Sequence, residues 1–422
     1  MKKTAILLIL LLGLISIEVS AKWFQQKTIY SKALHKEKTY YVGLPKGYNE
    51  ADTLTKYPVI VFLHGASVTA TDMVNSMEPF LDNFIAKILF DKLFKVIFVI
   101  PDGSCEPFKG SFYTNSALYG NYEDYISQDM MEEIGSKYHA YPGREKWSLM
   151  GHSMGGYGAM KVALQHPQKF IGVSALSGPL HITYYDEILP LLQSEHGSAA
   201  PYDFTYSGNV TQLLYSMAGA FSPNLSAVPS ILFPVNAEGF IDPLIRAMWE
   251  KHNPINFIRL WKGTPAMAIH SYCGEQDEFK LATPNKMFSD TLKKYHLPHT
   301  YKQDPMGDHV NSLFTSLPQG INFLYHVMDT AQIRIPTQVN DLTLTNAWSL
   351  YPNPAHDRIY VRGNSAHLQS IVIHNLSGQK VLQMEHPLME EGINISKLGK
   401  GVYFVSLLGE SGNTGTIKLV RQ

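Results

Sequence analysis

The stretch WSLMGHSMGGYGAMKVALQ, residues 147–165, joins an apolar run to a helical pattern through the motif Gly-x-Ser-x-Gly. The run before Gly151 is typical of a buried strand, and the residues after Ser153 have helical periodicity. A serine at such a sharp strand-to-helix turn exposes its hydroxyl group at the edge of a sheet, and Gly151, Gly155 and Gly156 avoid side-chain clashes there. The motif alone is equally compatible with a small residue in a tight turn, so the rest of the chain decides.

Alternating strands and helices surround this motif. Apolar runs typical of strands precede residue 305, at 38–45, 57–65, 95–103, 146–150, 170–178, 266–274 and 299–304. Helical patterns lie between or after them, at 123–138, 154–166, 284–296 and 311–328. This alternation predicts an α/β fold with a doubly wound, mostly parallel sheet over residues 22–332. Within it, residues 179–265 are too many for one crossover and predict an inserted subdomain. We expect its aromatic residues mainly to form its own core, with one or two lining a substrate pocket.

A nucleophilic serine needs a base, and the base needs an acid to orient it. In folds with this turn the partners follow in the order serine, acid, histidine. The loop CGEQDEF after the strand at 266–274 offers Glu275, Asp277 and Glu278, of which Asp277 fits best because it lies several residues beyond the strand end. His309 lies in a loop between strand and helix, whereas the other histidines beyond Asp277 lie within or at the ends of predicted elements: His296, His299 and His326. The sequence therefore predicts Ser153 as nucleophile, His309 as base and Asp277 as acid.

The tetrahedral intermediate of acyl transfer also needs two fixed N–H donors for its oxyanion. The backbone amide of Met154, directly after the serine, supplies one. The other is expected in HGASVTA after the strand at 57–65, where Gly65 lets the backbone turn and Ala66 is the predicted donor. Three further histidines are expected to be structural or to line the pocket: His64, His152 and His270.

Composition excludes several classes of function. The formal net charge is -1, so nothing favours nucleic acid as a partner. No group of His, Cys and acidic residues has the spacing of a metal site, and we expect neither a metal nor another cofactor. The two cysteines, Cys105 and Cys273, are associated with different predicted strands. Strands that far apart favour two thiols over a disulfide.

The N-terminal residues have the pattern of an export signal. Two lysines precede an apolar run from Ala5 to Ile17, and EVSA places small residues at the positions of a cleavage site. This predicts a secretory signal peptide over 1–21, cleaved after Ala21. The run is shorter than the ~20 residues of a spanning helix, and no other segment is apolar enough to cross a membrane.

The pattern changes beyond residue 332. Residues 333–346 have no helical period and are expected to form a linker. Residues 347–422 are short alternating strands punctuated by turn residues such as Ser377-Gly378, which predicts a small antiparallel β-sandwich.

Residues 25–330 resemble the putative-esterase family of α/β-hydrolases, which includes esterase D (S-formylglutathione hydrolase), feruloyl esterases, enterobactin-type esterases and mycolyltransferases. The stretches that carry the resemblance are VFLHGAS (61–67), PDGS (101–104), NYEDYISQDMMEEIGSKY (121–138), GHSMGGYGAMKVALQHPQKF (151–170), YCGEQDEF (272–279) and GDHVNSLF (307–314). The resemblance implies an α/β-hydrolase fold and the same site residues: Ser153, Asp277, His309, Ala66 and Met154. Esterase D-like enzymes are cytosolic, however, and compact members lack so long a stretch as 179–265. These departures favour a carbohydrate-linked or lipid-like ester over a glutathione thioester. The expected substrates are carbohydrate-linked, aryl or short-chain acyl esters.

The last 75 or so residues resemble the type IX secretion sorting domain, through YPNPAHDRIYV, VIHNLSGQKVLQ, LGKGVYFV and GTIKLVRQ. The resemblance implies recognition by the type IX secretion machinery, export across both membranes, and removal of the domain or attachment to the cell surface. The residues alone are also compatible with a carbohydrate-binding or adhesive sandwich.

Taken together, the sequence predicts a secreted serine carboxylic-ester hydrolase that works through an acyl-enzyme. Four alternatives stay open. The acyl group could pass to a sugar or alcohol, or the substrate could be a thioester of the S-formylglutathione type. The hydrolase fold could serve as a non-catalytic binding module, and peptidase activity is a weaker option.

Overall fold

The computed structural model describes residues 23–81, 95–196, 208–236, 240–329, 348–363, 368–375, 380–387, 392–409 and 414–422. The predicted signal peptide and the predicted linker lie outside these ranges. The chain divides into two compact units, Met1–Thr337 and Gln338–Gln422, and each is described by itself.

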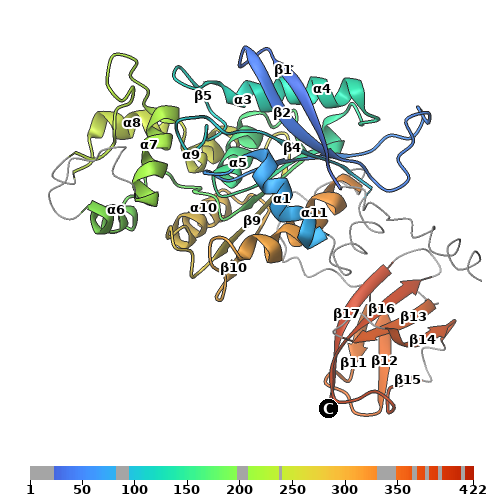
Figure 1. The fold of residues 1–422 in the computed structure, drawn as a ribbon. Helices are drawn as coiled ribbons and strands as arrows, with labels where there is room; N and C mark the ends of the chain where they lie inside the picture. Colours follow the sequence, from blue (N-terminus) through green and yellow to red (C-terminus); the bar gives the residue numbers. More distant parts are fainter. Residues whose placement is uncertain are drawn as a thin grey trace, which may run out of the picture. The chain divides into compact units, whose positions relative to one another are not determined.

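One eight-stranded sheet forms the centre of the first unit (Figure 1). Its strands are β1 (Gln25–Ser31), β2 (Lys36–Gly43), β3 (Val59–Leu63), β4 (Ile97–Pro101), β7 (Trp147–His152), β8 (Gly172–Leu176), β9 (Ala268–Gly274) and β10 (His299–Asp304). They are ordered β1-β2-β4-β3-β7-β8-β9-β10. The pairs β1–β2 and β2–β4 are antiparallel, and every pair from β4 to β10 is parallel. Every residue of β3, β4, β7 and β8 is buried, which explains why these strands are continuous apolar runs.

Helices cover both faces of this sheet. On one face α1 (Ala70–Leu81) and α11 (Ser312–Asp329) pack with β3 and β4 side chains such as Phe62 and Phe98. On the other face α4 (Met130–Lys137), α5 (Met154–Gln165) and α10 (Ala282–Lys294) pack against alternate residues of the same strands, such as Val61 and Val99. The predicted doubly wound α/β fold is confirmed.

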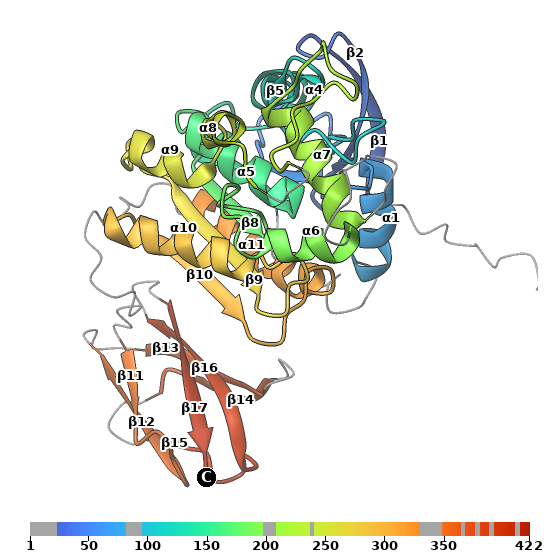
Figure 2. The ribbon, with the colours of Figure 1, turned by 90° about the vertical axis from the view of Figure 1, so that its left-hand side faces the viewer.

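The segment 179–265 contributes four described helices: α6 (Ile188–His196), α7 (Asn209–Phe221), α8 (Pro243–Glu250) and α9 (Pro254–Trp261). Helices α6 and α7 pack against each other (Figure 2). The expectation that the aromatic residues of this segment form a separate core is wrong. Phe221 and Trp249 belong to the same buried cluster as the sheet residues. The reason is direct packing, because the Phe221 ring lies 5.5 Å from that of Tyr157 on α5 and 5.7 Å from that of Phe112.

The second unit consists of short antiparallel strands in two small sheets, as predicted. One sheet has the order β11-β12-β15, and the other β14-β13-β16-β17. The strands are β11 (Trp348–Tyr351), β12 (Arg358–Gly363), β13 (Leu368–Asn375), β14 (Lys380–Glu385), β15 (Ile393–Asn394), β16 (Gly401–Gly409) and β17 (Thr414–Arg421). Apolar residues from both sheets, including Ile359, Ile371 and Val405, form one buried cluster.

Both cysteines are free and buried. Cys105 follows β4 and Cys273 lies in β9, and three strands separate β4 from β9 in the sheet. At ~4.8 Å per strand the two chains are about 19 Å apart, far beyond the reach of a disulfide. Within the described ranges, no helix combines the length and apolar character needed to cross a membrane.

Candidate active site

Ser153 lies at the turn between β7 and α5, with φ 57° and ψ −121°. A positive φ is costly for a residue with a Cβ, and such strain is a common feature of functional turns. The turn is held by Ser153 N, which donates to Leu176 O at 2.9 Å, and by Tyr157 N, which donates to Ser153 O at 3.0 Å. Only glycine fits at position 155, because a Cβ there would lie 1.8 Å from the Leu63 carbonyl oxygen. The glycine therefore lets α5 begin directly against the end of β3.

The structure brings Ser153, His309 and Asp277 into one hydrogen-bonded chain. His309 Nε2 lies 2.9 Å from Ser153 Oγ, and His309 Nδ1 lies 2.7 Å from Asp277 Oδ2. Asp277 is fully buried after the end of β9, and His309 is nearly buried in the loop after β10. Because a carboxylate only accepts, the Nδ1–H donates to Asp277 and leaves Nε2 to accept the serine proton. This arrangement can turn a hydroxyl group into a nucleophile.

The backbone of His309 is held on both sides. Its N–H donates to Glu278 Oε2 at 2.9 Å, and its carbonyl oxygen accepts from His152 Nε2 at 2.8 Å. Burial lowers the pKa of His152 to about 4, so its ring is neutral at pH 7. The Phe279 ring meets the His309 ring edge-on, with centroids 4.7 Å apart. These contacts fix the position of the imidazole beside Ser153.

Sequence reasoning missed the contacts that Glu278 and His152 make with His309. The sequence offers Glu278 only as an alternative acid, and it predicts that His152 is structural or lines the pocket. Their positions directly after Asp277 and directly before Ser153 were the available signal.

The two segments predicted to donate to the oxyanion lie against Ser153. Met154 is the first residue of α5. The loop with Ala66 passes close by, because a Cβ at Gly65 would lie 3.4 Å from Ser153 Cβ. Gly110 lies near both segments, since a Cβ there would meet Met154 Sδ at 2.2 Å and Ala66 Cα at 3.8 Å. The donor roles of Ala66 and Met154 stay predictions.

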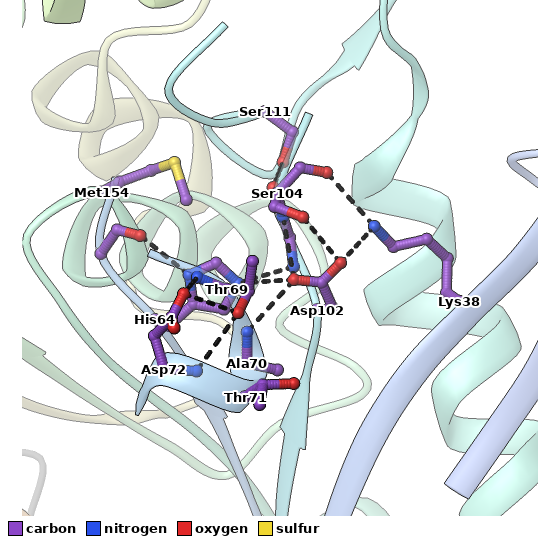
Figure 3. A network of polar contacts seen from close by, with 12 residues as sticks. Lys38, His64, Thr69, Ala70, Thr71, Asp72, Asp102, Ser104, Ser111 and Met154 are labelled. Carbon is purple, nitrogen blue, oxygen red and sulfur yellow. Dashed lines mark hydrogen bonds and ion pairs between the residues drawn. The ribbon is translucent and has the colours of Figure 1, made fainter. Parts of the chain in front are cut away.

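A buried polar network anchors the loop that follows β3 (Figure 3). The backbone N–H of Gly103 donates to His64 Nε2 at 2.8 Å. The other ring nitrogen, His64 Nδ1, lies 2.8 Å from the Gly65 carbonyl oxygen. Asp102 Oδ1 accepts from Ala70 N at 3.2 Å, where α1 begins. Between these anchors Ser67 N donates to the carbonyl oxygen of residue 109 at 2.7 Å. The loop is therefore fixed at both ends and near its middle.

Asp102 is the charged centre of this network. Its Oδ2 accepts from Lys38 Nζ at 2.5 Å and from Ser104 Oγ at 2.8 Å (Figure 3). Burial by itself raises the carboxyl pKa, but contacts with the His64 ring and with the Lys38 ammonium group outweigh it. They hold the pKa of Asp102 well below its usual range. Lys38 and Asp102 are both buried, so each depends on the other for charge compensation.

The remaining predicted structural histidine lies away from Ser153. His270 is buried in β9, and its Nδ1 lies 2.8 Å from Ser174 Oγ on β8. Burial lowers the pKa of His270 to about 4. It therefore contributes a neutral hydrogen-bonding group between two strands.

A pocket that is partly open to solvent includes Ser153 and His309 in its lining, and the empty space within it, open solvent included, is about 740 Å³. Its wall is mostly apolar, and most of it comes from three parts of the chain. The segment 179–188 and helix α7 contribute Tyr184, Tyr185, Ile188, Val210, Leu213, Leu214 and Met217, and the loop after Asp277 contributes Phe279 and Leu281. As expected, aromatic residues of the long segment 179–265 line the pocket.

Residues 31–317 match the putative esterase family. Residues 349–422 match the secretion system C-terminal sorting domain. The first match spans more than half of the chain and includes every residue predicted for the active site.

Solved structures with the same fold include a ferulic acid esterase, at 20% identity and a TM-score of 0.50, which covers 72% of this chain and 98% of its own. The fluorophosphonate-binding serine hydrolase FphF of Staphylococcus aureus is 19% identical, with a TM-score of 0.50 and coverage of 72% and 98%. An S-formylglutathione hydrolase from Agrobacterium tumefaciens is 18% identical, with a TM-score of 0.50 and coverage of 73% and 97%. At these identities the likeness establishes the fold.

Proposed function

Because the chain belongs to the putative esterase family, we propose that this α/β hydrolase is a secreted serine carboxylic-ester hydrolase. The observation that carries the proposal is the chain of hydrogen bonds from Ser153 through His309 to Asp277 at the edge of an apolar pocket. The substrates proposed are carbohydrate-linked, aryl or short-chain acyl esters.

In the proposed reaction Ser153 Oγ attacks the ester carbonyl carbon while His309 Nε2 takes the hydroxyl proton. Asp277 stabilises the imidazolium that forms. The carbonyl oxygen becomes an oxyanion and accepts hydrogen bonds from the Met154 and Ala66 amides. Collapse expels the alcohol, which receives the proton from His309. A water molecule then attacks the acyl-enzyme with the same base, releasing the acid and restoring Ser153.

The test compares Ser153→Ala with the wild type on p-nitrophenyl esters and with a fluorophosphonate probe. We expect kcat of Ser153→Ala to fall by at least about 10⁴-fold and labelling by the probe to disappear. The rate that remains would come only from substrate binding and the oxyanion donors, without a nucleophile. Ser194→Ala is a matched control, since the Ser194 hydroxyl group lies on an exposed face of α6 and donates to the Leu191 carbonyl oxygen of the same helix. Full activity in Ser153→Ala would refute the assignment. Product analysis with an added alcohol separates hydrolysis from acyl transfer, which would use the same residues.

The C-terminal unit matches a secretion sorting domain, which supports secretion to the cell surface or medium. We propose that the signal peptide over 1–21 directs the chain across the inner membrane. The type IX machinery would then recognise residues 349–422, move the protein outward, and remove or attach that unit. Deletion of 349–422 should leave an active esterase inside the outer membrane, and activity in the medium from the deleted form would contradict this.

A further inference from the structure

The pocket beside Ser153 is lined mostly by apolar side chains. Helix α7 lines it with four residues at helical spacing: Val210, Leu213, Leu214 and Met217. Ile188 of α6 and the buried ring of Phe112 complete this part of the wall. Methionine and leucine side chains adapt to a flexible hydrocarbon better than to a rigid polar group.

Several polar side chains of the lining are engaged elsewhere or exposed, whereas the buried hydroxyl group of Tyr185 has no hydrogen-bond partner among the described residues. Glu187 accepts from Thr283 Oγ1 at 2.7 Å. His181 Nδ1 lies 3.1 Å from Asn253 Nδ2, and burial lowers its pKa. Lys280 is exposed. Apart from the tyrosine hydroxyl groups this lining offers few free partners, so a sugar in the pocket would leave most of its own hydroxyl groups unpaired, which is costly.

We infer that this pocket binds the acyl half of the ester, and that the preferred acyl group is an unbranched aliphatic chain longer than acetyl. The inference rests on the proposed function and specifies its substrate class. Helix α7 acts as the specificity-determining element, because its side chains contact the chain while Ser153 carries out the chemistry.

The acyl half is assigned to this apolar pocket for a mechanistic reason. After the first step the alcohol has to leave and water has to reach His309, so the leaving-group side has to communicate with solvent. The acyl group stays bonded to Ser153 Oγ during this exchange. A mostly apolar pocket stabilises the acyl group while it stays bonded to Ser153, and burial of this group contributes to both transition states.

The experiment varies one half of the ester at a time. With p-nitrophenol fixed as the alcohol, kcat/KM should rise by about fourfold for each methylene along the series acetyl, butyryl, hexanoyl, octanoyl, until the pocket is full. With the acyl group fixed, lengthening an aliphatic alcohol should change kcat/KM much less. A preference for acetyl or for hydroxycinnamoyl over matched alkyl chains, or a length dependence confined to the alcohol, would overturn the inference.

Leu213→Trp locates the effect on α7. Because Leu213 lines the pocket and is only half-buried, the larger ring can enter the pocket without overpacking the core. We expect at least a tenfold fall for octanoyl relative to acetyl. Leu191→Trp on α6 is the matched control, since Leu191 is half-buried too but lies outside the lining. An equal fall in the ratio of octanoyl to acetyl activity in Leu213→Trp and Leu191→Trp would contradict a specific role for α7.

Binding to Ser153→Ala separates this inference from the proposed function. Calorimetry should detect octanoate but not acetate at the same concentration, and Leu213→Trp in the same background should weaken octanoate binding. Ester hydrolysis by the wild type without octanoate binding or length dependence would refute the pocket assignment alone. Octanoate binding without hydrolysis or fluorophosphonate labelling would refute the proposed function and leave a lipid-binding pocket.

Discussion

Replacing Asp102 by asparagine tests whether the network behind β3 positions the proposed oxyanion donor Ala66. Asp102 Oδ2 accepts from Lys38 Nζ and Ser104 Oγ, and Oδ1 accepts from Ala70 N. An asparagine amide keeps only one acceptor oxygen, so either the lysine or the start of α1 loses its partner. Where Ala70 N loses its acceptor, the loop that contains Ala66 loses one of its two end anchors.

The expected magnitudes follow from burial and position. Leaving the buried Lys38 ammonium group without its counter-charge should lower the free energy of unfolding by ~3–5 kcal/mol. Removal of one oxyanion donor lowers kcat by about 10²–10³-fold. Displacement of a catalytic group by ~1 Å lowers the rate by about 10²-fold. We therefore expect kcat to fall by about 10²-fold. KM should change little, because the donor acts mainly on the transition state.

The assay measures kcat and KM on a p-nitrophenyl ester, together with urea denaturation. Inhibition by a trifluoromethyl ketone, which forms a tetrahedral adduct, should weaken by the same factor as kcat. Glu123→Gln is the matched control. Glu123 is as buried as Asp102 and pairs with the buried Lys161, on helix α5 away from the Ala66 loop.

The Glu123 carboxylate contributes to the free energy of unfolding by an amount similar to that expected for Asp102. Burial raises the pKa of Glu123, but contacts with His166 and Lys161 outweigh it and lower this pKa to about 2, from an ordinary 4.5. The difference between the two pKa values contributes ~3 kcal/mol to the free energy of unfolding above pH 4.5. Glu123→Gln should therefore lose stability and keep kcat. If Asp102→Asn lost stability but kept kcat and inhibitor affinity, the loop would not depend on this carboxylate and the reasoning would be refuted.

Three further outcomes are expected. The pKa of His270 is about 4 in the folded chain against an ordinary 6.5, so stability should be full above pH 6.5 and fall as pH drops toward 4. In urea titrations His270→Asn should reduce that slope by ~1.4 kcal/mol per pH unit, and an unchanged slope would contradict the burial argument. Gly155→Ala should yield no soluble enzyme on expression, because its Cβ would overlap the Leu63 carbonyl group, whereas Gly135→Ala in an open part of α4 should raise the melting temperature. Cys105 and Cys273 should react with a thiol reagent only in denaturant, and a mass two hydrogens lower would show a disulfide instead.

The fold was predictable where burial leaves a periodic trace in the sequence. Strands β3 and β4 are buried at every residue and appear as unbroken apolar runs. Strand β1 was missed because its first four residues are exposed and give no alternation. Helix α1 was missed because its apolar pattern is short and contains Pro79.

The residues of the candidate site were predictable from position, because parallel strands place their carboxyl ends at one edge. Asp277 and His309 follow β9 and β10, and Ser153 follows β7. The pairing of Lys38 with Asp102 was not predictable, since 64 residues separate them and the contact depends on how β2 lies beside β4. The same holds for the contact of Glu278 with the His309 amide, which depends on backbone orientation in two loops.

The contacts around His309 close on themselves. One circuit runs from the ring to Asp277, along the chain to Glu278 and back to the His309 amide, and another runs from the His309 carbonyl group to His152, along the chain to Ser153 and back to the ring. The two circuits share the His309 imidazole, so two independent sets of contacts hold the same ring in place. Loss of the His152 contact or of the Glu278 contact alone should therefore be tolerated better than the loss of both. The site thus has a reserve of support at the residue that we propose as its base, His309.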